Sequence, residues 1–228
     1  MSAAVIDDAL DRRRRRAMRV RGLYAVTPEL ADTQELVARV DAVLAGGATA
    51  IQYRSKWLAP RERHAQAAAL ARVVAARGAL LIINDDAELA AAVDADGVHL
   101  GEDDGGIDRA RRILGPARIL GVSCYNDLSR AEAAVADGAD YIAFGSFFAS
   151  GVKPDARRAE PSLLDRARRF NVPIVAIGGI TADNAGGLVR AGADAVAVIS
   201  AVFGSSDVTE IEHAARALCA AMAARDAA

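Results

Sequence analysis

The sequence predicts a single (βα)8 TIM barrel, and three observations lead to this prediction. Short apolar segments recur eight times along the chain, and a longer segment rich in Ala, Arg and Glu separates each from the next. A glycine-containing turn repeats where these longer segments end. The chain has 228 residues, enough for one barrel of this class, which runs to about 250 residues. A doubly wound open sheet is the alternative.

The apolar segments have the pattern of parallel strands that are buried on both faces. Each is four or five residues long and apolar throughout, without the alternation of a half-exposed strand. The expected strands are 22–26, 50–53, 80–83, 97–100, 119–123, 141–144, 174–177 and 195–199.

The segments between the strands carry helical signals. In 33–45 the leucines and valines recur at three- and four-residue steps, as in an amphipathic helix. Segment 60–77 begins with Pro60 and ends before Gly78, which are typical helix start and stop signals. Segment 181–191 begins with Thr181, a candidate N-cap.

The repeated turn contains Gly47, Gly138 and Gly192 between an expected helix and the next strand. Glycine adopts the left-handed C-cap conformation that other residues resist. No composition break follows, so we expect one barrel domain over 21–228. Segment 1–20 contains an unbroken row of arginines, 12–16, and we expect a disordered, solvated tail there rather than an RNA-binding or anionic-surface arm.

Composition narrows the function classes. The net charge of −2 argues against a nucleic-acid platform, and no apolar run approaches the roughly 20 residues of a membrane span. The two cysteines, Cys124 and Cys219, lie far apart without metal-ligand spacing. We expect a cytoplasmic enzyme that acts on small molecules, without nucleic-acid or membrane partners, and a homo-oligomer is compatible with the sequence.

Three polar residues follow the second strand. Gln52, Arg54 and Lys56 alternate, so an extended backbone places them on one face. One amide and two cations form a clamp for a polyanion such as pyrophosphate. A solvated edge with ordinary surface cations is the alternative.

Carboxylates follow the third and fourth strands. Asp85 and Asp104 would meet at neighbouring strand ends, where Mg²⁺ takes one or two carboxylates plus substrate phosphate oxygens. Helix N-capping by Asp85, Asp86 and Asp104 explains each residue equally well when it is taken singly. Next to a cationic clamp, the pair favours metal binding.

Ser123 and Cys124 follow the fifth strand. We interpret Ser123 as a hydrogen-bonding ligand, because no suitable His accompanies it as a triad partner. Cys124 lacks a base and is expected to be a small buried residue. His99 lies inside the fourth strand and is expected to be a hydrogen-bonded core histidine.

The last three loops have the composition of anion-binding segments. Loop 145–154 is rich in small and hydroxyl residues and contains Lys153, as suits a loop that closes over an anionic ligand. Gly179 and Ser200 follow the seventh and eighth strands, where barrels often bind a phosphate at helix starts. This pattern predicts a phosphate ligand but no particular reaction.

Taken together, these stretches resemble the thiamine phosphate synthase family over residues 22–204. The matching motifs are Gln52-x-Arg54-x-Lys56, Asn84-Asp85, His99-Leu100-Gly101 with Asp104, Gly121-Val122-Ser123, Lys153, 176–180 and 198–200. The resemblance implies Mg²⁺-assisted condensation of 4-amino-2-methyl-5-(diphosphooxymethyl)pyrimidine with a thiazole phosphate, giving thiamine phosphate and pyrophosphate. Pyrophosphate would leave first, so positioning and charge neutralisation would supply the catalysis.

The resemblance also implies roles for individual residues. Arg54, Lys56, Ser123 and Lys153 would be catalytic, and with Gln52 and Asn84 they would hold the pyrimidine diphosphate. Asp85 and Asp104 would bind Mg²⁺. The thiazole phosphate would be bound by Ser150, Gly151, Val152, Gly179, Ile199 and Ser200. Departures from the commoner family pattern occur at Glu102, Tyr125, Asn126, Ser146 and Val152.

Two other functions remain open for this barrel. One is a TenI-like thiazole tautomerase, an isomerase that binds one phosphate and no metal; the other is a non-catalytic phosphate-ligand sensor. The clamp with Asp85 and Asp104 favours the synthase, because an isomerase has no pyrophosphate to hold and a sensor needs no metal carboxylates.

Overall fold

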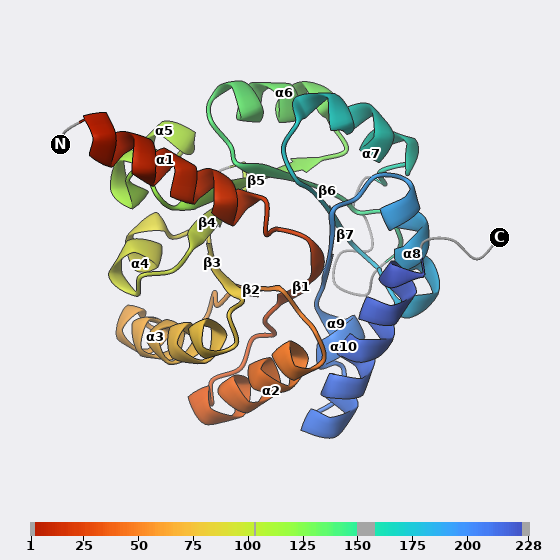
Figure 1. The fold of residues 1–228 in the computed structure, drawn as a ribbon. Coiled ribbons are helices and arrows are strands. Elements are labelled where there is room, and N and C mark those ends of the chain that lie inside the picture. The colour runs from red at the N-terminus through yellow and green to blue at the C-terminus, as the bar shows by residue number, and fades with distance from the viewer. Residues whose placement is uncertain (1–2, 103, 150–157, 225–228) are drawn as a thin grey trace.

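Eight parallel strands form a closed barrel in the order β1 to β8, and β8 pairs with β1 (Figure 1). The computed structural model describes residues 3–102, 104–149 and 158–224. The predicted (βα)8 barrel is therefore confirmed. The strands are β1 Gly22–Val26, β2 Ala50–Tyr53, β3 Leu80–Asn84, β4 Gly97–Leu100, β5 Ile119–Tyr125, β6 Tyr141–Phe144, β7 Ile174–Ile177 and β8 Ala195–Val198. Relative to the prediction, β3 and β5 extend further and β8 ends one residue earlier.

Helices surround the barrel wall (Figure 1). Thr181 caps α8 in a capping box with Asn184, as the sequence predicts, and Asp32 caps α2. None of the helices in the described part of the chain is long and apolar enough to cross a bilayer. The helices are α1 Ala3–Ala17, α2 Thr33–Ala45, α3 Pro60–Ala76, α4 Ala87–Ala92, α5 Ile107–Leu114, α6 Leu128–Ala136, α7 Ser162–Ala167, α8 Ala182–Arg190, α9 Ser200–Phe203 and α10 Val208–Ala223, with a short 3-10 turn at Arg168–Phe170.

The core has two layers because the strands bury both faces. The larger layer fills the space between sheet and helices and includes Leu36 of α2 and Ile51 of β2. The smaller layer fills the barrel interior and includes Tyr24, Ile119 and Tyr141. Strands buried on both faces need no polar alternation, which explains their uniformly apolar sequences.

The repeated glycine turn has the predicted geometry. Gly47, Gly138 and Gly192 have φ angles of 106°, 99° and 118°, in the region that side chains disfavour. Each lies just after a helix and before an even-numbered strand, so each reverses the chain towards the barrel.

Aspartates before three of the even-numbered strands connect neighbouring strands. Asp96, Asp140 and Asp194 stand before β4, β6 and β8. Each carboxylate accepts a hydrogen bond from a backbone N–H at the start of the preceding strand, at 3.0, 2.9 and 2.9 Å. A charged acceptor strengthens such bonds, so these side chains fix strand starts at the amino end of the barrel.

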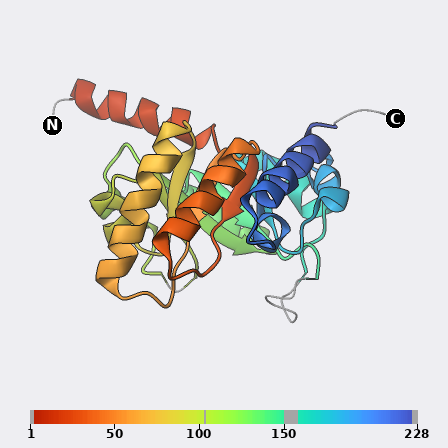
Figure 2. The same cartoon turned by 90° about the horizontal axis from the view of Figure 1, so that it is seen from below.

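The basic N-terminal segment is not a disordered tail, and that prediction is wrong for residues 3–17, which form α1. Figure 2 shows α1 lying across one end of the barrel. Arg13 Nε lies 3.1 Å from Asp140 and Arg16 Nε 3.0 Å from Asp96. Ala17 and Val20 are buried within the interior layer of the core. Two arginines of the row therefore have acidic partners in the barrel, which charge patterning alone does not reveal.

Candidate active site

The clamp residues lie at the end of β2 but differ in their surroundings. Gln52 is buried inside the barrel, and its Nε2 donates to the Tyr24 hydroxyl at 2.9 Å. The regular strand ends at Tyr53, so Arg54 and Lys56 occupy the loop that follows. Lys56 and Asn84 line a cleft of about 280 Å³ together with Asp85. The structure thus brings Lys56 next to the third loop.

Glu29, which the sequence analysis did not single out, organises this loop. Its Oε1 lies 3.2 Å from the Arg54 guanidinium, and both of its oxygens accept from the Lys56 backbone N–H at 3.1 Å. The rule that reactive residues follow strand ends applies equally to the first strand, and it could have found Glu29 three residues after Val26.

Asp85 and Asp104 meet at the mouth, the end of the barrel where the strands finish. The Asp85 backbone N–H donates to the His99 carbonyl at 2.8 Å, and Asp85 adopts a φ of 66°. Burial raises the pKa of Asp85 to about 6, and a hydrogen bond with Asp104 and its charge act in the same direction. Lys56 and Arg54 lower the same pKa, so both cations act on the acidic pair.

Helix capping, the alternative to metal binding, is the role of Asp86 and not of Asp85 or Asp104. Asp86 caps α4: its Oδ1 accepts from the Leu89 N–H and its Oδ2 from Arg63, both at 2.8 Å. Asp104 instead accepts from the Gly101 N–H at 2.6 Å, and the N-cap of α5 is Gly106. Asp85 and Asp104 are therefore left facing each other.

The acidic pair suits Mg²⁺ better than a metal with many protein ligands. Among the described residues, no group of three or more His, Cys, Asp or Glu side chains could hold an ion. Mg²⁺ keeps several waters and takes one or two carboxylates plus phosphate oxygens. Two touching carboxylates beside a cationic clamp fit this preference, because a divalent cation removes their mutual repulsion.

Ser123 has a histidine neighbour, contrary to the expectation from sequence. His99 Nε2 lies 2.9 Å from Ser123 Oγ, and His99 Nδ1 lies 3.1 Å from the Tyr141 hydroxyl. Burial lowers the pKa of His99 to about 4, so it is a poor base for activating a nucleophile. The prediction of a hydrogen-bonded core histidine is confirmed.

Cys124 of β5 is a small buried residue, as expected from the sequence. Burial raises the pKa of its thiol to about 12. Two departures from the family pattern, Glu102 and Tyr125, contact Arg130, another residue missed from sequence. Arg130 Nη1 lies 3.1 Å from Glu102, its guanidinium lies 5.4 Å from the Tyr125 ring centroid, and its Nε donates to the Ser123 carbonyl at 2.8 Å.

The loops of the thiazole end are described in part. Ser150, Gly151, Val152 and Lys153 lie outside the described residues. Gly179 has a φ of 64°, and a side chain there would come within 2.4 Å of the Ala149 carbonyl oxygen. Loop seven therefore packs directly on loop six. Ser200 begins α9, directly after Ile199.

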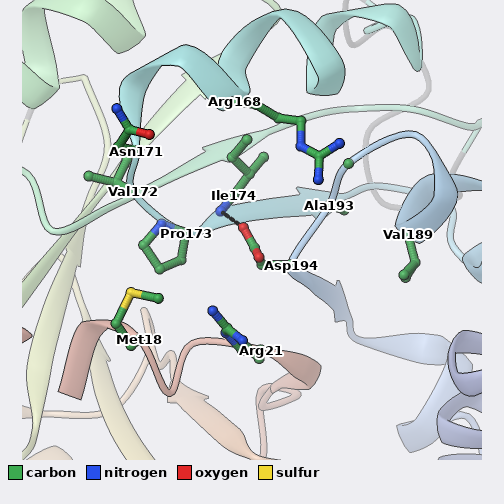
Figure 3. A pocket seen from close by; sticks show the side chains of 11 residues that line it. Met18, Arg21, Arg168, Asn171, Val172, Pro173, Ile174, Val189, Ala193 and Asp194 are labelled. Atoms are coloured by element: carbon green, nitrogen blue, oxygen red, sulfur yellow. Dashed lines mark hydrogen bonds between the residues drawn. The ribbon is translucent and has the colours of Figure 1, made fainter. Parts of the chain in front are cut away.

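A second cleft of about 280 Å³ lies at the opposite end of the barrel, where β7 and β8 begin (Figure 3). Arg21, Arg168 and Asn171 line it, and the Asp194 carboxylate in its wall is bonded to the Ile174 N–H. None of the residues predicted to bind substrate or metal lies there. Barrel active sites occupy the carboxyl ends of the strands, so this cleft belongs to the structural end.

Comparison with known proteins identifies the family. A family model described as thiamine monophosphate synthase matches residues 23–202. The thiamine-phosphate synthase of Methylobacillus flagellatus is 55% identical over 189 residues, covering 83% of this chain and 90% of the relative. That of Thiobacillus denitrificans is 55% identical over 188 residues, covering 82% and 89%. The solved structure of thiamine phosphate pyrophosphorylase from Pyrococcus furiosus is 36% identical, with a TM-score of 0.78, covering 90% of this chain and 97% of that one. The chain therefore belongs to the thiamine monophosphate synthase family.

Proposed function

We propose that the barrel mouth catalyses the synthase reaction of this family. The C–O bond between the pyrimidine methylene and its diphosphate breaks, and the electron pair leaves with pyrophosphate. The nitrogen of the thiazole phosphate then forms the new C–N bond. The proposal depends on one observation: Asp85 contacts Asp104, and the positive charges of Arg54 and Lys56 act on this pair.

These residues suit the departure of a diphosphate. Positive side chains fixed beside a leaving group stabilise the charge that develops on it, and each such donor is worth about 3–4 kcal/mol of barrier. Mg²⁺ held by Asp85 and Asp104 would neutralise further charge on the pyrophosphate oxygens. Gln52, Asn84 and Ser123 would orient the pyrimidine diphosphate.

The thiazole phosphate is assigned to the other side of the mouth. Gly179 allows loops six and seven to pack against each other, because a side chain there would meet Ala149 and Phe148 of loop six. The residues proposed to bind this substrate are Ser150, Gly151, Val152, Gly179, Ile199 and Ser200, with Lys153 reaching the pyrophosphate.

The tautomerase and sensor alternatives lack support of this kind. An isomerase acting on one phosphate has no use for two metal carboxylates next to two cations. The relatives at 55% identity are named thiamine-phosphate synthase.

The direct test is an assay with both substrates, with and without metal. Purified protein with Mg²⁺ should form thiamine phosphate and release pyrophosphate, and EDTA should stop the reaction. Turnover at full rate in EDTA would reject the metal role. Isomerisation of the thiazole without condensation would replace the synthase with the tautomerase.

Substitutions test the residue assignments. Asp85→Ala should abolish activity with the fold intact, whereas Asp165→Ala, on the exposed side of α7, should leave it unchanged. Arg54→Ala should chiefly raise KM for the pyrimidine diphosphate, with exposed Arg72→Ala as the matched control. An effect of Arg54→Ala confined to the thiazole substrate would contradict the clamp.

A further inference from the structure

A continuous chain of hydrogen bonds crosses the barrel interior. Gln52 Nε2 donates to the Tyr24 hydroxyl at 2.9 Å, and that hydroxyl lies 3.0 Å from the Tyr141 hydroxyl. The Tyr141 hydroxyl lies 3.1 Å from His99 Nδ1, and His99 Nε2 lies 2.9 Å from Ser123 Oγ. We call these five residues the interior chain. Its two ends, Gln52 and Ser123, both belong to the proposed pyrimidine site.

The middle of the interior chain is shut off from water. Tyr24, Tyr141 and His99 are 2%, 0% and 8% exposed. A buried hydroxyl proton without an acceptor is destabilising, so each proton must go to a neighbour within the interior chain. The rings are held in place: His99 stacks on Tyr141 with centroids 5.5 Å apart.

With the Gln52 amide donating to Tyr24, these constraints give the interior chain one direction. The Tyr24 oxygen already accepts from Gln52, so its own proton goes to Tyr141. The Tyr141 proton then goes to His99 Nδ1, which must be the unprotonated nitrogen. His99 Nε2 carries the proton and donates it to Ser123 Oγ. The Ser123 hydroxyl, which accepts from His99, therefore has its own proton available to a ligand.

We propose that Tyr24, Tyr141 and His99 are positioning residues whose one-way hydrogen bonds make Ser123 a donor to an oxygen of the departing pyrophosphate. This assignment of the ligand rests on the proposed function. The direction of the interior chain does not depend on the ligand, because it follows from the Gln52 amide donating to Tyr24 and from the need of each buried proton for an acceptor. If the hydrogen bonds ran in the reverse direction, Ser123 would donate its proton to His99 and would have no proton to donate to the anion.

The direction is open to measurement in the wild-type protein. The protein contains three histidines, so long-range ¹H–¹⁵N spectra can assign the tautomer of each ring. We expect His99 with a protonated Nε2 and an unprotonated Nδ1. Protonation at Nδ1 would overturn the proposal, and it would do so even if the protein proved to have another activity.

Tyr141→Phe removes the donor to His99 Nδ1 and keeps the ring. The variant should free the His99 tautomer, so that signals of the Nδ1–H form appear. Tyr53→Phe is the matched control for this spectrum, because Tyr53 is also buried and donates to Gln66, outside the interior chain, at 2.9 Å. An unchanged His99 tautomer in folded Tyr141→Phe would overturn the proposed control by Tyr141.

A double-mutant cycle of Tyr141 and Ser123 tests whether the interior chain affects the reaction. Tyr141→Phe should lower kcat about 10-fold while KM for the thiazole phosphate stays the same, since a hydrogen bond to a charged group is stronger than one between neutral groups. In a Ser123→Ala background the same change should cost nothing more. Additive losses would show that Tyr141 acts on the fold rather than through Ser123, and would overturn the proposal. If neither substrate reacts with the wild type, the proposed function fails and the tautomer result stands alone.

Discussion

Glu29 and Arg54 form an ion pair at the barrel mouth, with Glu29 Oε1 3.2 Å from the Arg54 guanidinium. Glu29 also accepts from the Lys56 backbone N–H. One carboxylate thereby holds both cations of the clamp in place, one through its side chain and one through its backbone. A cation that is already oriented loses less entropy when a polyanion binds.

Removing Glu29 should weaken the clamp without touching the substrate directly. We expect Glu29→Ala to raise KM for the pyrimidine diphosphate roughly 5–30-fold, since about 1–2 kcal/mol is lost with such hydrogen bonds. Glu29→Gln keeps an acceptor for the Lys56 N–H and should be milder. Steady-state kinetics with each substrate varied in turn provide the measurement, and a rise confined to the thiazole phosphate would contradict this role.

Asp85→Asn should stabilise the metal-free protein at high pH. The folded pKa of Asp85, about 6, lies above its ordinary value of 3.8, so the folded state holds this proton more strongly than the unfolded state. Ionisation of Asp85 therefore lowers stability as the pH rises from about 4 to 6, and the full loss is present above that. Asn also tolerates the φ of 66° at this position.

The measurement is thermal unfolding in EDTA at pH 4 and pH 8. The gain in Tm from Asp85→Asn should be larger at pH 8, and each kcal/mol corresponds to about 2–4 °C in a domain of this size. Equal gains at both pH values would show that the backbone conformation alone explains the effect. Activity should be lost in the same variant, because the amide cannot replace a metal carboxylate.

Helix α1 should contribute stability and leave catalysis unchanged. Replacing Arg13 and Arg16 by Ala removes the pairs with Asp140 and Asp96 and should lower the free energy of unfolding by about 1–2 kcal/mol. Replacing Arg12 and Arg15 removes the same charge from exposed positions and should cost much less. Denaturant melts compare the two double variants. A change in KM from the first pair would contradict the separation of the two barrel ends.

Gly121→Ala should damage the barrel interior. A methyl group at Gly121 would lie 1.9 Å from Cζ of Tyr141, a rigid ring atom that has no room to move. Overpacking of this kind costs about 1–3 kcal/mol, and displacement of Tyr141 would also break the interior chain. Combining Gly121→Ala with Tyr141→Leu should recover stability but not kcat. Recovery of both in the double variant would argue against a role for the Tyr141 hydroxyl.

Trp57 offers a reporter of ligand binding at the clamp. It is the single tryptophan of the chain, it is 81% exposed, and it follows Lys56 directly. Binding of pyrophosphate with Mg²⁺ at the clamp should shift its fluorescence emission, and Asp85→Ala should abolish the shift. An unchanged spectrum at saturating ligand would place the anion away from Lys56.

The sequence by itself determined the barrel and which strand ends form its mouth. Uniformly apolar strands, glycines after helices and polar residues after strand ends are local signals, and each follows from backbone geometry and burial. That is why the strand at 50–53 and the turn at Gly138 could be predicted from residues close together in the chain. The proximity of Asp85 and Lys56 could be predicted because the loops after barrel strands gather at one end.

Only the tertiary structure decided which side chains meet across the barrel. The pairs Arg16–Asp96, Glu29–Arg54 and His99–Ser123 join residues 24 to 80 positions apart. Pairing of neighbouring strands and packing of α1 against the barrel bring these residues together. Charge and residue type along the chain do not show which distant residues come into contact. The arginine row therefore predicts a disordered tail where the structure has α1, and the sequence does not predict His99 beside Ser123.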